Sequence, residues 1–228
     1  MGGRAGDPVL GGQSDRVDKL VLVQSGITVR HFGSPYAQNQ NAYAISLPGR
    51  LACGNLNFFA SMPCVGRYYA LVPSTVTAVS QDLLRAMCRK DSESCITVMQ
   101  EFEYTLSDRI AFGATVALSI RDRILAFLLT LATALGTLER IDGALWVSMP
   151  TPLSNDALRK VIYSSQATFE RAWRALREDG IYVADSDRAR ILLSALEPVH
   201  RWLGHQEEHQ SDCKRGRLEQ IFAVTSQR

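Results

Sequence analysis

The sequence lacks a long hydrophobic run. Its longest apolar stretch of helical character, AFLLTLATAL at residues 126–135, would cross only half a bilayer and follows the charged segment IRDRI. The N-terminal segment MGGRAGDPVLGGQSD also lacks the basic-then-apolar pattern of a secretory signal. We therefore expect no membrane partner and a cytoplasmic location.

Cysteine is scarce, and no two cysteines form a CxxC pair. The chain has five, an odd number, so neither a disulfide framework nor a structural zinc site is indicated, and free thiols are the expected state. Cys53 and Cys64 suit a redox pair or haem ligation, but buried free cysteine is commonly just a small apolar residue. Three further groups of cysteine and histidine residues lack a convincing arrangement of metal ligands: Cys88 with Cys95; His205 with His209 and Cys213; and His31. We therefore predict no metal site and no cofactor.

Arrangements of catalytic residues are missing as well. No Ser-His-Asp or Cys-His set, Gly-rich phosphate loop or paired carboxylates stand out, so we do not expect an enzyme. A formal net charge of +2 does not by itself imply a nucleic-acid partner. With 228 residues, 46% of them hydrophobic, the chain is long enough to fold around one large or two small cores.

The first half of the chain changes from strand-like to helical texture. Short β-rich runs broken by Gly, Pro and Asn predict a small antiparallel β domain over residues 19–80. QDLLRAMCRK (81–90) predicts a short amphipathic helix, and residues 96–118 a longer one. The longer helix carries a narrow stripe of apolar and small residues: Met99, Phe102, Leu106, Ile110, Gly113 and Ala117. This stripe fits a close helix–helix contact between two copies of the chain. The alternative is an ordinary helix that faces the core of its own chain.

The second half predicts a winged helix. IRDRILAFLLTLATAL (120–135) is an amphipathic helix and ALWVSMP (144–150) a strand. A short helix after Ser154 and a second one capped by Ser165 are joined by a turn of about four residues, which is the spacing of a helix-turn-helix. The second helix should end near Gly180, and IYVADSDRARILL then reads as a hairpin around ADSD.

The second helix of this pair combines an anchoring face with a basic one. Phe169, Ala172, Trp173 and Leu176 recur at steps of three and four, which indicates a buried face. Residues 159–177 hold five basic side chains against one acidic one, so the positive charge is local. Hydroxyls near a helix N-terminus suit phosphates, and Gln and Arg suit adenine and guanine edges. The alternative is a solvated helix face with ordinary arginines.

Residues 153–181, LSNDALRKVIYSSQATFERAWRALREDGI, resemble the helix-turn-helix of the cyclic-AMP receptor/FNR superfamily of bacterial transcription regulators. DRVDKLVLVQSGITVR (15–30) and LPGRLACGNLNFF (47–59) resemble segments of that family's β-roll, and SIRDRILAFLLTLA (119–132) resembles the helix that opens its DNA-binding domain. The resemblance implies an α+β fold: a β-roll sensor domain (1–95), a dimerisation helix (96–118), a winged helix-turn-helix (119–203) and a polar tail (204–228).

The same resemblance implies roles for individual residues. Phosphate contacts fall on Ser165 and Thr168, and the base-reading positions fall on Gln166, Ala167 and Arg171; Arg174 and Arg188 complete the candidate DNA-binding set. The family's usual acidic reader falls on Ala167, so a carboxylate accepting from cytosine is absent and the DNA site should differ from the family's best-known consensus.

The expected effector pocket departs from the cyclic-nucleotide pattern. Gly54-Asn55 stands where the family has Gly-Glu, and Cys64-Val65 where it has the Arg-Ser pair that holds the cyclic phosphate. An uncharged pair cannot balance a partly buried phosphate, and Arg67 could substitute only with a shift in loop register. We therefore predict no cyclic-AMP response, and the effector is unknown. The short lead before residue 15 also suggests a pared-down pocket and constitutive DNA binding.

These observations predict a homodimeric, sequence-specific DNA-binding transcription regulator that acts on a palindromic site. Double-stranded DNA, a second copy of the chain and RNA polymerase are the partners that the resemblance implies. The alternative is a sensor or scaffold module whose helix-turn-helix contacts protein instead of DNA.

Overall fold

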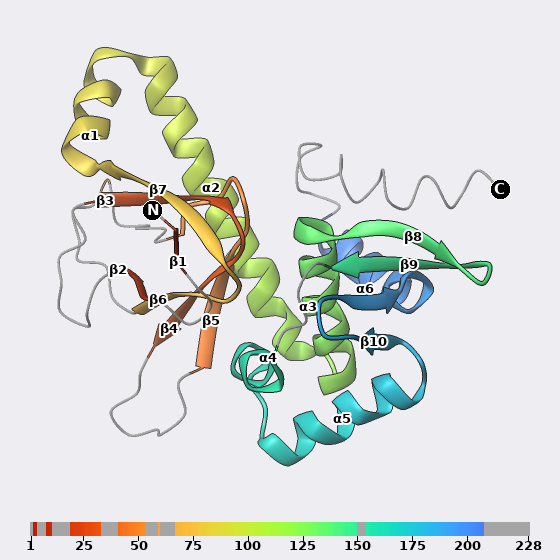
Figure 1. The fold of residues 1–228 in the computed structure, drawn as a ribbon. Helices are drawn as coiled ribbons and strands as arrows, with labels where there is room; N and C mark the ends of the chain where they lie inside the picture. The colour runs from red at the N-terminus through yellow and green to blue at the C-terminus, as the bar shows by residue number, and fades with distance from the viewer. Residues whose placement is uncertain are drawn as a thin grey trace. The chain divides into compact units, whose positions relative to one another are not determined.

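A computed structural model describes residues 2–3, 8–10, 19–32, 41–52, 59, 67–149 and 154–207 of the chain. The chain divides into two compact units (Figure 1). The first consists of Met1–Ala114 and Asn155–Tyr163, and the second of Thr115–Ser154 and Ser164–Arg228. Each unit contains both strands and helices, in agreement with the α+β class expected from the sequence.

Two antiparallel sheets form the β part of the first unit. In one sheet, β7 (Ser74–Ser80) lies between β1 (Gly2–Gly3) and β3 (Lys19–Ser25). The other has the order β2 (Pro8–Leu10), β6 (Arg67–Ala70), β4 (Thr28–Phe32) and β5 (Asn41–Ser46). Val21, Val23 and Val29 are almost completely buried in these strands. The β-rich texture expected over residues 19–80 is therefore confirmed for the part of that range that the structure describes.

A turn at Gly26 joins β3 to β4. Gly26 has a φ of +80°, and a Cβ atom there would lie 2.3 Å from the carbonyl oxygen of Pro73. The buried Ser74 hydroxyl holds the same corner, because it accepts from the Ile27 amide at 3.1 Å and donates to the Val72 carbonyl at 2.7 Å. Glycine is thus required at this turn both for its backbone conformation and for space.

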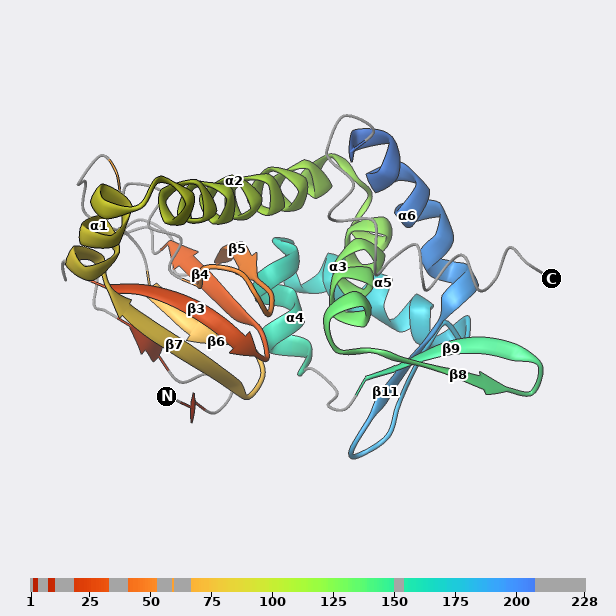
Figure 2. The same cartoon turned by 90° about the horizontal axis from the view of Figure 1, so that it is seen from above.

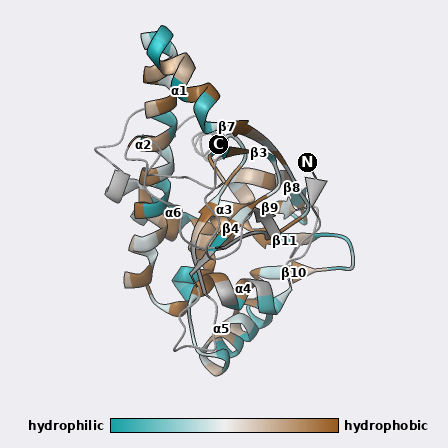
Figure 3. Cartoon of the chain, turned by 90° about the vertical axis from the view of Figure 1, so that its left-hand side faces the viewer, coloured by the Kyte–Doolittle hydropathy of each residue, from teal (hydrophilic) through white to brown (hydrophobic). Residues whose placement is uncertain are grey.

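A helical corner follows the sheets. Helix α1 (Gln81–Lys90) is separated by Asp91 alone from the long helix α2 (Ser92–Ala114), and Figure 2 shows the length of α2. Phe102 of α2 is 8% exposed and packs with Leu20 and Leu51 of the β part. Hydrophobic and hydrophilic residues, brown and teal in Figure 3, are mixed along α2. The expected helix 96–118 is thus present, although it begins four residues earlier and its end is a 3₁₀ turn, η1 (Thr115–Ala117).

The second unit is built around helix α3 (Ile120–Leu135). Ser119 caps α3, because its side chain accepts from the Asp122 amide at 3.2 Å. Eight residues of the helix are buried. A four-stranded antiparallel sheet has the order β10 (Tyr182–Ala184), β11 (Ala189–Leu192), β9 (Ala144–Met149) and β8 (Thr137–Ile141). Helices α5 (Gln166–Glu178) and α6 (Leu193–Glu207) both pack on α3.

Helix α4 (Asn155–Ile162) groups with the first unit, where it contacts β5. We expected all of residues 119–203 to belong to one winged-helix domain, so the contact pattern divides the two helices of the expected helix-turn-helix between the units. Along the chain, α4 and α5 are joined by residues 163–165, and Tyr163 has a φ of +56°. Within the part of the chain described, no helix is long and apolar enough to cross a membrane.

Candidate nucleic-acid interface

Both ends of α5 are defined by local hydrogen bonds. Ser165 accepts from the Thr168 amide at 3.3 Å, and its hydroxyl donates to the Thr168 hydroxyl at 2.8 Å. At the other end, the Gly180 amide donates to the Arg177 carbonyl at 3.1 Å and the Ile181 amide to the Leu176 carbonyl at 3.0 Å. This pair of bonds is the Schellman motif, and the φ of +68° at Gly180 makes it possible. The expected cap and stop signals are therefore confirmed.

One face of α5 anchors the helix in the second unit. Phe169, Trp173 and Leu176 are 1%, 4% and 0% exposed. The Trp173 ring stacks on Phe169 with a centroid separation of 5.9 Å and meets the Tyr182 ring at 4.4 Å. Asp179 at the end of α5 also pairs with Arg121 of α3 at 2.8 Å. The helix is thus held by its apolar side, as its spacing predicted, and its orientation within the unit is fixed.

The opposite face of α5 is polar and exposed. Ala167, Arg171 and Arg174 follow steps of four and three, so they lie on one side of the helix, and all three are exposed. Arg171, Arg174 and Arg177 form no ion pair with any residue that the structure describes. Nearby, the Gln166 amide donates to the Glu170 carboxylate at 2.8 Å. The N-terminal end of the helix therefore presents hydroxyl and amide groups, and its length presents uncompensated cations.

Fewer basic side chains of residues 159–177 are seen to be unpaired in the structure than the five counted in the sequence. Arg159 lies in α4 and pairs with Asp156 at 3.0 Å, so its charge is locally compensated. The Lys160 side chain lies outside the described side chains. Among the described side chains of this segment, the free positive charge is carried by the three arginines of α5.

The wing is present but close to neutral. Strands β10 and β11 form the predicted hairpin, and the Asp185 amide donates to the Arg188 carbonyl at 2.9 Å across its turn. Arg190 pairs with Asp185 at 2.8 Å. Arg188 is half-exposed and lies 3.8 Å from carboxylate oxygens of both Glu139 and Asp187. Arg188 is thus accessible, but unlike Arg171 it already has acidic neighbours.

The expected dimer contacts fall on two sides of α2. Met99, Leu106 and Ile110 are 47%, 45% and 59% exposed, and Gly113 is exposed near the end of the helix. Ala117 is exposed in η1, beyond α2. Phe102 does not join this stripe, since it is buried in the core of the first unit. Ile96, 55% exposed, extends the stripe toward the start of α2 and was missed, although it lies three residues before Met99.

Most of the expected effector pocket lies outside the described residues. This applies to Gly54, Asn55, Cys53 and Cys64, while Arg67 is described only as a backbone position of β6. His209 and Cys213 also lie outside, and His31 and His205 are described without their side chains. Across the residues that are described, no three His, Cys, Asp or Glu side chains gather into a metal-binding group.

A charged cluster joins α2 to the loop after β5. Arg50 pairs with Asp108 at 2.9 Å, and its guanidinium lies 4.8 Å from the centre of the Tyr104 ring. Glu101 lies beside this pair, and burial raises the pKa of its carboxyl above the usual range. Sequence reasoning did not identify this cluster, because its α2 members are distant from Arg50 along the chain and only the fold brings them together.

Comparison with known proteins places this geometry in context. The sequence matches no protein-family model and no curated protein. Its fold, however, is similar to TTHB099, a CRP-family transcriptional regulator from Thermus thermophilus, with a TM-score of 0.69 and 19% identity over 87% of this chain and 95% of that one. It is also similar to FixK2 from Bradyrhizobium japonicum, with a TM-score of 0.66 and 16% identity over 88% and 94% of the two chains.

A third similar structure is that of CLP from Xanthomonas campestris, described as a c-di-GMP responsive global regulator. Its TM-score is 0.62 and its identity 16%, over 84% of this chain and 92% of that one. At these identities the likeness concerns the fold. The chain has the fold of the CRP/FNR transcription regulators, an antiparallel β-roll followed by a long helix and a winged helix-turn-helix, as the sequence resemblance implied.

Proposed function

We propose that this chain is a CRP/FNR-type transcription regulator that binds DNA sequence-specifically through α5. The observation that carries the proposal is the exposed side of α5, where Arg171 and Arg174 lack partners among the described residues while the opposite side is locked into the core. A helix that enters the major groove requires both features, a rigid apolar anchor and free long donors. The shared fold supports the same assignment.

The N-terminal end of α5 supplies the phosphate contacts in this proposal. Ser165 and Thr168 place two hydroxyls beside the first amides of the helix, where the helix dipole also favours an anion. Gln166 and Arg171 are the base readers, Ala167 approaches the bases without a polar group, and Arg174 and Arg188 contact the backbone. The acidic neighbours of Arg188 make its contribution smaller than that of Arg174.

The functional unit is a homodimer on a palindromic site. The exposed apolar stripe of α2 supplies the contact between copies, and two recognition helices then reach half-sites about one helical turn apart. The regulator acts in the cytoplasm, with RNA polymerase as its further partner. Because Cys64-Val65 stands at the phosphate-binding position of the cyclic-nucleotide pattern, DNA binding does not depend on cyclic AMP.

Selection of bound duplexes from a random DNA pool by the purified protein, with and without cyclic AMP, tests this proposal. We expect one palindrome to be enriched equally in both arms, with an affinity that falls steeply as salt rises. The control pair is Arg171→Ala with Arg174→Ala in one chain, against Arg201→Ala, which removes an exposed arginine of α6. The double variant should lose the enrichment and Arg201→Ala should retain it. Enrichment that survives the double variant would refute α5 as the reader, and no enrichment with the intact chain would favour the scaffold role.

A further inference from the structure

Glu170 is the one acidic residue of the basic segment 159–177. It lies in the second turn of α5, it is exposed, and its Oε1 accepts from the Gln166 amide at 2.8 Å. Arg174 and Arg177 follow one and two turns later on the same side of the helix. None of the ion pairs among the described residues includes Glu170. Its carboxylate therefore does not serve to neutralise the arginines of its own helix.

The Glu170 carboxylate lies over the first turn of α5. Side chains of an α-helix lean toward its N-terminus, so each covers the turn that precedes its own Cα. For Glu170 that turn contains Gln166 and Ala167, and the hydrogen bond from Gln166 shows that the carboxylate reaches it. Ala167 is exposed and carries only a methyl group, so its side chain leaves room there. The carboxylate is thus at the end of α5 where a recognition helix meets base edges.

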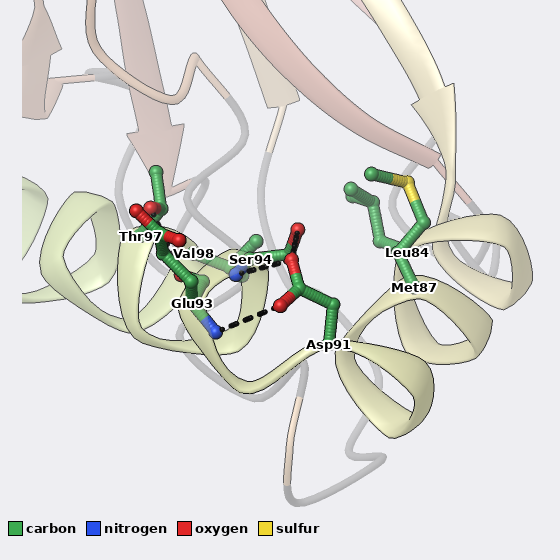
Figure 4. Close-up of a pocket in the computed structure, with 7 residues that line it drawn as sticks. All are labelled: Leu84, Met87, Asp91, Glu93, Ser94, Thr97 and Val98. Carbon is green, nitrogen blue, oxygen red and sulfur yellow. Dashed lines mark hydrogen bonds between the residues drawn. The ribbon is translucent and has the colours of Figure 1, made fainter.

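Asp91, between α1 and α2, shows how an exposed carboxylate of this chain is used when its role is structural. It borders a hollow of about 340 Å³, and one of its oxygens accepts from the Glu93 amide at 3.2 Å and the other from the Ser94 amide at 3.0 Å (Figure 4). Both oxygens hold the start of α2. Glu170 differs, because no described group donates to its Oε2. Half of its carboxylate is therefore available to a ligand.

A carboxylate oxygen in the major groove of DNA matches one base edge best. It can only accept hydrogen bonds, and the cytosine edge offers the N4 amino group as a donor without an acceptor of its own base beside it. Adenine places the N7 acceptor next to its amino group, guanine and thymine present acceptors, and phosphate oxygens are negatively charged. A carboxylate on this side of α5 therefore weakens binding to most sequences and favours cytosine.

We propose that Glu170 is a specificity-determining residue of α5, whose Oε2 accepts a hydrogen bond from the N4 amino group of a cytosine in each half-site. The inference rests on the proposed function, in which α5 enters the major groove. Gln166 holds Oε1 and so restricts the orientation of the carboxylate, and it keeps its carbonyl and second N–H for an adenine edge. The sequence predicted no carboxylate for cytosine because only position 167 was considered. In the fold, residue 170 brings one to the same turn.

Selection from a random DNA pool, repeated with two variants of the full chain, tests the proposal. Glu170→Gln keeps an oxygen for the Gln166 amide but presents a donor in place of the free carboxylate oxygen. Glu178→Gln is the matched control, because Glu178 is also an exposed acidic residue of α5 but lies in its last turn. We expect Glu170→Gln to lose the preference for cytosine at one base pair of each half-site, and Glu178→Gln to retain the preferences of the parent.

Titration of the selected duplex, and of a duplex in which that C·G pair is exchanged for T·A, measures the size of the effect. The exchange should weaken binding of the parent and of Glu178→Gln by about tenfold for each half-site, but binding of Glu170→Gln by less than about twofold. Both variants should bind DNA of unrelated sequence slightly more tightly than the parent, because each lacks one negative charge.

The outcomes separate this inference from the proposed function. Base preferences that are unchanged in Glu170→Gln would overturn the role of Glu170. A change confined to an A·T pair whose preference Gln166→Ala also loses would overturn it too, since Glu170 would then only orient Gln166. In both cases the intact chain still enriches a palindrome, and the proposed function stands. If the intact chain enriches no site, the proposed function is refuted and the role of Glu170 with it.

Discussion

Arg171 and Arg174 lie on the same side of α5, but they are expected to contribute to DNA binding in different ways. Arg171 is nearer the N-terminal end of the helix, where a recognition helix meets base edges, and Arg174 is one turn further along. Arg171→Ala should weaken binding to the selected site by about 1–3 kcal/mol and relax the preference at one base pair. Arg174→Ala should weaken binding to all sequences similarly and reduce the salt slope by about one.

Titration of both variants against the selected duplex and its single-base variants, at two salt concentrations, separates these roles. A uniform loss of affinity for Arg171→Ala would reduce that residue to a phosphate contact. An unchanged affinity would remove it from the interface, because no other function of its exposed side chain is seen in the described structure.

Tyr182 packs against Trp173 of α5 and should make the stability of the second unit sensitive to alkaline pH. Its side chain is 5% exposed against Trp173, and burial raises its pKa to about 12, with Arg177 acting in the opposite direction. The unfolded chain would release this proton near pH 10. Because the folded-state pKa is the higher one, the stabilisation is fully present below pH 10 and is lost as the pH rises through 12.

The difference in unfolding free energy between the parent and Tyr182→Phe should therefore change by about 2–3 kcal/mol between pH 9 and pH 12. Phenylalanine keeps the ring contact with Trp173 but cannot ionise. Denaturant unfolding at a series of pH values measures the difference, and parallel curves for the two proteins would show that Tyr182 ionises as it does in water.

Among the elements, η1 depends on one side chain of the following helix. The Arg123 guanidinium donates to the carbonyls of Thr115 at 3.2 Å, Val116 at 2.6 Å and Leu118 at 3.2 Å. These carbonyls lie at the end of the α2–η1 helical run, where backbone acceptors lack helical partners. Burial lowers the pKa of Arg123 from its ordinary value. A single arginine thus donates to three carbonyls of this segment, and the Thr115 carbonyl also accepts from the Leu118 amide at 3.0 Å.

Arg123→Ala should destabilise the second unit by about 1–3 kcal/mol, because it removes the side-chain donor to the Val116 and Leu118 carbonyls, while the Thr115 carbonyl keeps its bond from the Leu118 amide. The neighbouring Arg121→Ala breaks only the exposed pair with Asp179 and should cost at most about 1 kcal/mol. Urea unfolding with hydrogen exchange at residues 115–119 distinguishes the two variants. Equal, small effects of both would show that water replaces the guanidinium at no cost.

The elements also show which features the sequence could predict. The bounds of α5 were predictable, because Ser165 and Gly180 act through bonds to residues within five positions of themselves. The role of Phe102 was not, since α2 carries one apolar side that packs on Leu20 and another that stays exposed, and only long-range contacts separate them. Strand β8 was missed because its residues are largely exposed and do not alternate clearly. The Asp142-Gly143 turn to β9, with φ values of +50° and +81°, was the signal that could have revealed it.

At the scale of the whole molecule, the exposed stripe of α2 is the feature that a single chain leaves unexplained. Ile96, Met99, Leu106, Ile110 and Gly113 lie at heptad spacing, and all are exposed. Apart from the exposed Glu103, which occupies the heptad position between Met99 and Leu106, this seam is apolar or small and is unfavourable in water, and Gly113 would permit close approach of a second helix near its end. Two copies that pack along this seam would bury it on both chains.

Leu106→Glu should therefore convert the proposed dimer to a monomer, because it places two further carboxylates in the centre of the seam. Light scattering after size exclusion should give twice the mass of one chain for the parent and half that value for the variant. Val183→Glu adds the same charge at an exposed apolar residue of β10 and should leave the mass unchanged. The monomeric variant should also lose most of its affinity for the palindrome while retaining weak binding to a half-site, because α5 itself is intact and only the coupling of two readers is removed. A dimeric Leu106→Glu chain would show that the contact between copies lies elsewhere.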